Sequence, residues 1–308
     1  MDKLYVVTAI SNPVRYKARY ALYHRFAKQM LASGVHFYTV EMAFGNRPFE
    51  VTSADNPCHL QVRSDQELWH KENLLNLIIE KLPPEAKYVA WVDADVMFTR
   101  PDWAEETVEQ LQHFKVVQMF SHAQDLGPNF EPLQLHAGFV YNYLNFGTQD
   151  QSICPDEQQS NVNGHPGYCW AARRETLEQL GGLIDFAILG SADHNMAKAF
   201  LGLVDKTFFP GITQGYKDRL RAWQALATKH VLQDIGYVPG TINHYWHGKK
   251  KNRGYDTRWK ILSYSKFDPN TDLFKDDQGL ICIPETNLWL RDSIRKYFRS
   301  RNEDSVDV

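Results

Sequence analysis

The chain of 308 residues has few cysteines, no long apolar run and no excess of positive charge. Its four cysteines form no Cys-x-x-Cys pair, which argues against zinc and thioredoxin-like redox sites. No apolar stretch of about 18 residues occurs, and the N-terminus lacks the features of a signal peptide. The formal net charge of −3 argues against non-specific nucleic-acid binding. We therefore expect no membrane span and a cytoplasmic location, in a bacterium or, for a phage-encoded protein, in the infected cell.

The most informative motif is Asp93-Ala94-Asp95, which ends an apolar run from Tyr88 to Val92. Side chains at positions i and i+2 of a strand point the same way, so the two carboxylates leave the strand end side by side. Like charges this close need a cation. Oxygen ligands favour Mg²⁺ or Mn²⁺, ions that also hold a diphosphate. The motif therefore predicts metal-assisted chemistry on a phosphate-bearing substrate.

Strand and helix patterns alternate over the first hundred residues. We expect strands at 4–10, 35–42, 59–62 and 88–92, and helices at 16–31 and 66–82. This alternation predicts an α/β fold with a mainly parallel central sheet flanked by helices. Ligands of such sheets bind beyond the carboxyl ends of the strands. The aspartate pair follows the strand at 88–92 and so lies where a ligand site is expected.

The second half of the chain is less regular. We expect helices at 105–113, 173–180, 193–203 and 289–298, strands at 116–121, 138–143, 208–209 and 241–246, and long loops over the cleft within 122–168. The last residues, 301–308, have the composition of a disordered tail. We find no linker and expect one continuous domain at 1–290, followed by a C-terminal helix and tail at 291–308. The domain would have a nucleotide-sugar half at about 1–120, and an acceptor half with a lid at 121–290.

Three segments resemble, in order, the GT-A class of glycosyltransferases over roughly residues 1–260. The first is the apolar strand that ends in Asp93-Ala94-Asp95. The second is a small-residue-rich segment at 167–172, then a helix, then the acid of Ser191-Ala192-Asp193-His194. The third is a late histidine followed by basic residues, at 244–253. The resemblance implies a Rossmann-like GT-A fold and metal-dependent sugar transfer from a nucleotide-diphosphate sugar, expected to be a UDP-sugar, to an acceptor hydroxyl.

The resemblance also implies roles for individual residues. Asp95 would ligate Mn²⁺ or Mg²⁺ directly, and Asp93 would contact the ribose or reach the metal through water. A late histidine would be a further ligand. A spacing of three places His244 and His247 on opposite faces of a strand, so we expect only one to reach the ion and favour His247, beside Gly248. The metal would stabilise charge on the leaving diphosphate.

Asp193 is the candidate general base, which would take the proton of the acceptor hydroxyl and give inversion at the anomeric carbon. A helix cap is the competing interpretation, and His194 could supplement or replace Asp193. Other residues are expected to bind the nucleotide, either after the first two strands, at helix starts or in the late basic loop. These are Thr8, Ile10, Asn12, Arg15, Glu41, Lys71, Asp93, Lys250 and Arg253. For Glu41, Lys71 and the basic loop, an ordinary exposed position competes with this interpretation.

Three other functions stay open. A haloacid-dehalogenase-type phosphohydrolase also uses an Asp-x-Asp motif, but it has Thr or Val where this chain has Met97. A non-catalytic protein that binds a sugar nucleotide or a glycan is a second possibility. A third is transfer to modified bases of phage DNA rather than to a glycan or small molecule, because the lysines at 249–251 and the basic residues at 291–301 could meet phosphates.

Overall fold

The computed structural model describes residues 2–147, 164–255 and 257–308. Its main sheet has seven strands in the order β10-β6-β9-β4-β1-β2-β3, and only β9 runs antiparallel to the others. The strands are β1 (Leu4–Ser11), β2 (His36–Phe44), β3 (His59–Ser64), β4 (Tyr88–Val92), β6 (Val116–Gln118), β9 (Cys169–Arg173) and β10 (Ile235–Tyr237). The expected mainly parallel α/β sheet is confirmed.

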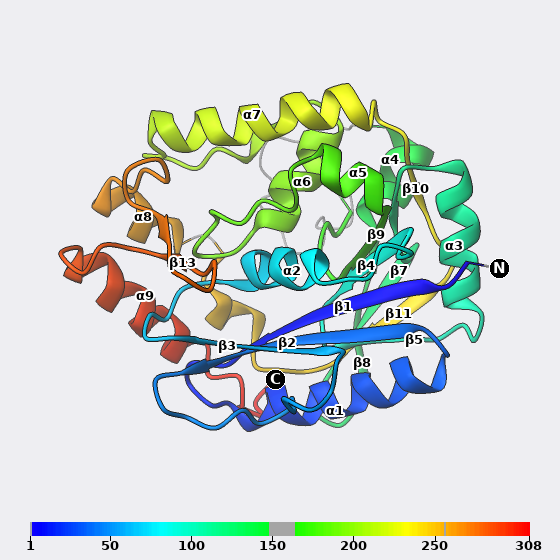
Figure 1. Ribbon diagram of the computed structural model, residues 1–308, viewed down its shortest axis with the longest axis horizontal. Coiled ribbons are helices and arrows are strands. Elements are labelled where there is room, and N and C mark those ends of the chain that lie inside the picture. Colours follow the sequence, from blue (N-terminus) through cyan, green and yellow to red (C-terminus); the bar gives the residue numbers. More distant parts are fainter. Residues whose placement is uncertain (1, 148–163, 256) are drawn as a thin grey trace.

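Helices cover both faces of this sheet (Figure 1). One face packs against α2 (Lys71–Glu80), α6 (Ala192–Phe200) and α7 (Gln214–His230), and the other against α1 (Lys17–Ala32) and α3 (Trp103–His113). The sequence of strand β1 shows why both faces of the sheet are covered. Tyr5 and Val7 belong to the core under α2, whereas Leu4 and Val6 belong to the core under α1. A parallel strand that is covered on both sides needs apolar residues at successive positions.

A second, four-stranded sheet has the order β5-β11-β7-β8. Its strands are β5 (Val96–Phe98), β7 (His122–Leu126), β8 (Pro132–Ala137) and β11 (Thr241–His244). The chain passes from β4 to β5 through the aspartate motif, which is therefore the junction between the two sheets. Backbone hydrogen bonds fix it on both sides, from the Asp93 N–H to the Tyr168 carbonyl (2.9 Å) and from the Tyr245 N–H to the Asp95 carbonyl (2.8 Å).

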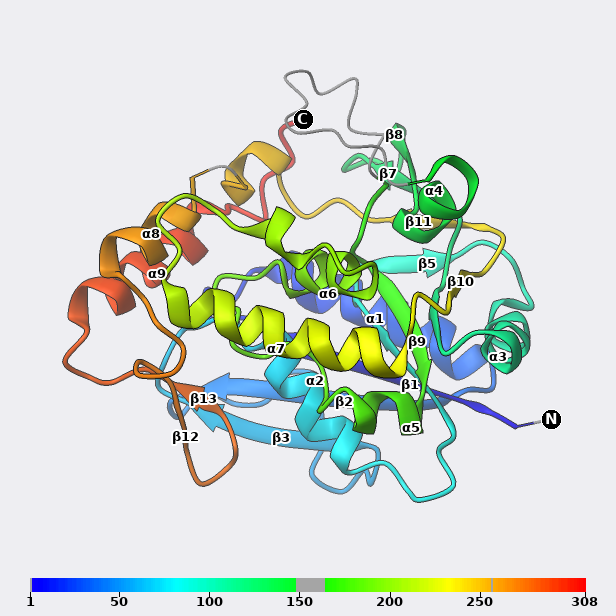
Figure 2. The same cartoon turned by 90° about the horizontal axis from the view of Figure 1, so that it is seen from above.

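The remaining elements surround this frame. They are α4 (Phe139–Phe146), α5 (Arg174–Gln179), α8 (Trp259–Ser265), α9 (Leu288–Ser300), the strand pair β12 (Phe274–Lys275) and β13 (Ile281–Cys282), and two 3₁₀ turns at Val204–Thr207 and Lys250–Arg253. Figure 2 shows α8 and α9 together at one end of the molecule, beyond one end of α7. None of the described helices has the length and apolar character needed to cross a membrane.

Four sequence predictions about these elements are wrong. Residues 138–143 give helix α4 rather than a strand, because a short apolar run suits a buried helix and a buried strand equally well. Residues 208–209 belong to no strand, and 122–126 and 132–137 form β7 and β8 rather than loops. The helix expected at 66–82 begins only at Lys71. Part of the expected loop, 148–163, lies outside the described residues.

The prediction of a disordered C-terminal tail is also wrong. Arg301 and Glu303 are 4% and 2% exposed. The two carboxylate oxygens of Asp304 accept the backbone N–H groups of Lys17 and Ala18 at 3.0 and 2.8 Å, at the N-terminus of α1. A charged segment folds here because its partners lie at the opposite end of the sequence, where no local pattern reveals them.

Candidate functional site

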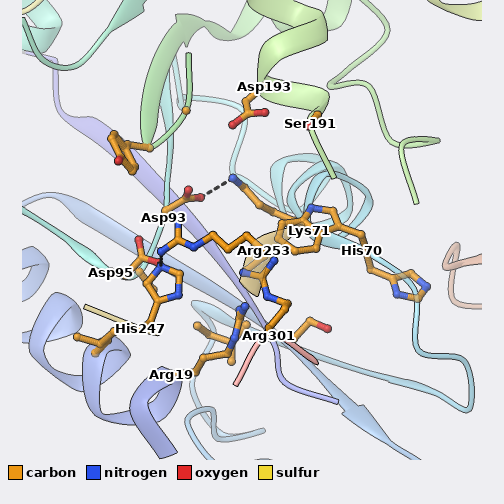
Figure 3. Close-up of a pocket in the computed structure, with 18 of the residues that line it drawn as sticks. Arg19, His70, Lys71, Asp93, Asp95, Ser191, Asp193, His247, Arg253 and Arg301 are labelled. Carbon is orange, nitrogen blue, oxygen red and sulfur yellow. Dashed lines mark hydrogen bonds and ion pairs between the residues drawn. The ribbon is translucent and has the colours of Figure 1, made fainter. Parts of the chain in front are cut away.

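A cavity lies beyond the carboxyl ends of β1 and β4, where the strand order of the main sheet changes direction. Many chain segments contribute to its wall, from the end of β1 to the C-terminal tail (Figure 3). Its charged and ionisable lining residues include Arg19, Lys71, Asp93, Asp95, His165, Asp193, His244, His247, Arg253, Arg258 and Arg301. The cavity thus combines carboxylates, imidazoles and four guanidinium groups.

Asp95, His244 and His247 form a cluster in which one ligand atom of each lies within 4.8 Å of the others. His247 Nε2 is 3.1 Å from Asp95 Oδ2 and 3.2 Å from His244 Nε2. Asp95 Oδ1 is buried and accepts no hydrogen bond from any described residue. A carboxylate with an unsatisfied oxygen beside two imidazole nitrogens fits a divalent cation such as Mn²⁺.

The expectation that only one of the two histidines reaches this point is wrong. It assumed a strand through both residues, but β11 ends at His244. The chain then turns, and Gly248 has a positive φ of +84° that favours glycine. His247 therefore returns toward the ring of His244 instead of pointing to the opposite face.

Burial and the neighbouring charges shift the pKa values of Asp95 and His247 in the direction that favours binding of a cation. Burial would raise the pKa of Asp95, but His247, His244 and Arg253 hold it well below its usual range. Burial and the nearby Arg253 lower the pKa of His247 to about 4. At neutral pH the cluster therefore presents one carboxylate and an uncharged His247, the protonation states that metal ligands require.

Behind His244 lies Asp125, which is 4% exposed and which the sequence analysis did not identify. His244 Nδ1 is 2.7 Å from Asp125 Oδ1, and the Tyr168 hydroxyl donates to the same oxygen at 3.1 Å. His136 and Lys250 contact the other oxygen. Burial would raise the pKa of Asp125, but His136 and His244 hold it well below its usual range. Asp125 therefore favours a proton on His244 Nδ1 and leaves Nε2 free to face Asp95.

We predict that Asp125→Asn weakens Mn²⁺ binding about 10- to 100-fold, because the neutral amide no longer fixes the imidazole of His244. Isothermal titration calorimetry with MnCl₂ measures the affinity, and circular dichroism checks the fold. Asp102→Asn, which changes an exposed acid before α3, is the matched control and should bind Mn²⁺ as the wild type does. Equal affinities for the two variants would contradict the orienting role of Asp125.

The other aspartate of the motif is paired differently. Asp93 Oδ1 lies 2.5 Å from the Nζ of Lys71, at the start of α2 (Figure 3). Burial would lower the pKa of Lys71, but Asp93 and Glu72 raise it, so the ammonium group keeps its charge. Burial raises the pKa of the adjacent Glu72 to about 7. Asp93 is therefore held by a lysine at the cavity wall and is not part of the ligand cluster.

Asp193 lines the cavity near Asp93 and Lys71 (Figure 3). It lies in the first turn of α6, and its Oδ1 accepts the N–H of His194 at 2.8 Å. A Cβ atom at Gly167 would lie 2.7 Å from Asp193 Oδ2, so a side chain there would displace the carboxylate. Ser191, which precedes the helix, has a left-handed φ of 70°, a strained conformation of the kind that clusters at functional sites.

Arg19, Arg253, Arg258 and Arg301 add four guanidinium groups to the wall. Arg253 Nη2 is 2.9 Å from His247 Nε2, and Arg258 is 5% exposed. Burial would raise the pKa of Tyr297, yet Arg301 and Arg258 lower it, so positive potential outweighs the effect of burial. A cavity with this potential is suited to an anionic ligand.

Four of the residues predicted to bind a nucleotide line the cavity, namely Ile10, Lys71, Asp93 and Arg253. The other five do not. Thr8 and Asn12 bond to nearby backbone groups, Arg15 pairs with Glu50, the Glu41 carboxylate accepts the N–H groups of residues 50–52, and Lys250 contacts Asp125. Their polar atoms are used to fix loops and strand ends.

The fold and the site define a mixed α/β protein with a candidate metal and anion cavity at the ends of its parallel strands. No family model matches the sequence, and no curated protein matches it. Among solved structures the chain is similar to the catalytic domain of Drosophila beta1,4-galactosyltransferase 7 in complex with xylobiose, with 12% identity, a TM-score of 0.44, and 94% of this chain and 99% of that chain covered.

A mutant of the same Drosophila enzyme in complex with manganese, UDP-Gal and xylobiose matches with 10% identity and a TM-score of 0.44, over 94% of this chain and 98% of that chain. S. aureus TarS matches with 11% identity and a TM-score of 0.40, over 84% of this chain and 65% of that chain. The chemistry of the cavity depends on the residues of this chain.

Proposed function

We propose that this chain is a metal-dependent glycosyltransferase that moves a sugar from a UDP-sugar to an acceptor hydroxyl. The observation that carries the proposal is the cluster of Asp95, His244 and His247 with Arg253 in contact with it. A divalent cation and a guanidinium group side by side match the two charged halves of a diphosphate. Their place beyond β1 and β4 is where sheets of this type bind nucleotides.

Each group has a separate task in the proposed reaction. Mn²⁺ or Mg²⁺ held by Asp95, His244 and His247 would act as a Lewis acid toward the leaving diphosphate. Arg253 binds phosphate oxygens and offsets the charge that grows on them as the glycosidic bond breaks. Asp93, fixed by Lys71, accepts a hydrogen bond from a ribose hydroxyl.

Asp193 is proposed as the general base. The acceptor oxygen attacks the anomeric carbon, the bond from that carbon to the diphosphate oxygen breaks, and the bonding electrons leave with the diphosphate. The proton of the acceptor hydroxyl passes to the Asp193 carboxylate. Attack from the side opposite to the leaving group inverts the configuration. Hydrogen bonding to the backbone of His194 holds the base in place.

The alternative of a DNA acceptor has little support in the pattern of charges. Arg295 and Arg299 both contact Glu67. Arg291 contacts Asp292, and Lys250 contacts Asp125. Several residues of the two basic segments are thus already paired with carboxylates, so they present a weaker field to phosphates.

The proposed function is tested by measuring thermal stability with a panel of nucleotide sugars, each with and without Mn²⁺. A UDP-sugar present at about 100 times its dissociation constant with Mn²⁺ should stabilise the protein by about 2.7 kcal/mol, and clearly less when Mn²⁺ is absent. Slow release of UDP from that sugar nucleotide would then separate a transferase from a pure binding protein. If no nucleotide sugar stabilises the protein in the presence of Mn²⁺, the proposal is wrong.

A further inference from the structure

The residues 301–305, which we call the C-terminal arm, return to the cavity after α9 and are fixed there by contacts with distant segments. The Asn302 N–H donates to the Tyr16 hydroxyl at 3.0 Å. Trp246 Nε1 donates to the Ser305 carbonyl at 2.6 Å. Asp304 accepts the first N–H groups of α1. The arm is therefore built into the fold at the side of the cavity where the segment 244–248 leaves β11.

Glu303 is the buried carboxylate of this arm, at 2% exposed. Both of its carboxylate oxygens bond to Arg19, with Nη2 at 2.8 Å from Oε1, and Arg301 Nε contacts the same carboxylate. Burial would raise the pKa of Glu303, but Arg19 and Arg301 hold it well below its usual range. The carboxylate therefore remains charged and holds two guanidinium groups together.

Arg19 and Arg301 both line the cavity, whereas Glu303 is not among the lining residues. Both arginines thus contribute to the cavity wall, while the carboxylate that pairs them does not. Two guanidinium groups share one carboxylate, so the group keeps a net charge of +1. Arg301 is fixed further by the Trp69 ring, 5.2 Å from its guanidinium carbon, and by the Tyr297 hydroxyl at 3.0 Å.

The arm also touches the segment that carries the metal-ligand cluster. A Cβ atom at Gly248 would lie 2.8 Å from the carbonyl oxygen of Asn302 and 3.0 Å from the Cα of Glu303. Since Gly248 follows His247 directly, the arginine pair is placed next to the candidate metal site. An anion with more than one charged group could reach both the arginine pair and the candidate metal site.

We propose that Glu303 is a positioning residue that holds Arg19 and Arg301 on the cavity wall so that they bind a phosphate group of a diphosphate ligand. The proposal rests on the proposed function for its ligand, a nucleoside diphosphate linked to a sugar. It adds a second cationic contact for the diphosphate, independent of the metal and of Arg253. Oriented guanidinium groups bind phosphate in fixed geometry, and the orientation depends on the carboxylate behind them.

Inorganic pyrophosphate in the absence of metal ions is the probe for this site, with affinity measured by isothermal titration calorimetry on the full chain. We expect Glu303→Gln to weaken binding about tenfold, because the amide accepts fewer charge-assisted hydrogen bonds from the two arginines. Arg301→Gln should weaken binding at least as much. Glu303→Gln should cause no further loss in a variant that already lacks both guanidinium groups, Arg19→Gln with Arg301→Gln, since Glu303 acts through these two arginines.

Asp304→Asn is the matched control, because it changes the neighbouring carboxylate, which caps α1 but does not contact either arginine. It should lower the melting temperature without changing pyrophosphate affinity. Unchanged or tighter binding by Glu303→Gln would overturn the proposal, as would an equal loss in Asp304→Asn. If the positioning role of Glu303 is overturned but the wild type still binds a UDP-sugar in a metal-dependent way, the proposed function is unaffected. If the wild type binds no UDP-sugar in the presence of Mn²⁺, the proposed function itself is wrong.

Discussion

Asp95→Ala should abolish Mn²⁺-dependent stabilisation of the protein and lower the rate of sugar transfer about 10³-fold. The variant removes the one carboxylate of the ligand cluster, including the buried Oδ1 that no described residue satisfies. The two histidines alone then face a dication without a carboxylate to compensate its charge. A loss of about 10³-fold corresponds to about 4 kcal/mol of transition-state stabilisation, in the range expected for a Lewis-acid contribution. Thermal shift with and without MnCl₂ and a UDP-release assay measure the two effects.

Asp93→Ala is the matched control variant for this prediction. Asp93 precedes Asp95 by two residues but pairs with Lys71, and it lies outside the ligand cluster. We expect this variant to keep Mn²⁺ binding and to lose affinity for the nucleotide sugar. If Mn²⁺ still stabilises Asp95→Ala, or if both variants lose Mn²⁺ equally, the unequal roles of the two aspartates are wrong.

Asp193→Asn should lower kcat for transfer about 10³-fold and leave the KM for the donor nearly unchanged. The amide keeps the size and the hydrogen bond to the His194 N–H but cannot take a proton. General-base catalysis contributes about 10²- to 10⁴-fold, and the loss appears in the chemical step because the donor does not bind through this group. Steady-state kinetics with an acceptor identified by screening measure the two constants.

His194→Gln is the matched control for the base. Burial lowers the pKa of His194, so its ring is uncharged at neutral pH and is the other candidate acceptor of a proton. We expect this variant to retain most of its activity. The assignment of Asp193 would be reversed by the opposite pattern, in which His194→Gln loses kcat and Asp193→Asn keeps it. Analysis of the product's anomeric configuration tests inversion separately.

Short-range patterns predicted much of the frame of this protein. The apolar run in β1 and the alternation of strands and helices indicated a parallel sheet, because both are set by neighbours in sequence. The place of Asp93 and Asp95 after β4 followed from the same pattern. Helix α7 was not identified, since its apolar positions are separated by many polar ones and only its partly buried side packs against the core.

Some residues of the candidate site could likewise be predicted from sequence, and others could not. Lys71, Asp95, Asp193 and Arg253 stand out by motif and by charge, and the structure brings them to one cavity. Asp125 and Glu303 could not be identified from sequence. Asp125 lies in a short strand and Glu303 in a charged tail, and their partners His244 and Arg19 are more than a hundred residues away in the sequence.

By itself the sequence determined the two-sided apolar strands, the acidic junction after β4 and the supply of basic residues, because these depend on residue type and spacing. Tertiary structure alone decided that His244 joins His247, since β11 ends between them and pairs with β5 beside Asp95. It also decided which arginines face the cavity. Long-range packing fixes the direction of Arg19, whose carboxylate partner Glu303 lies 284 residues away in the sequence.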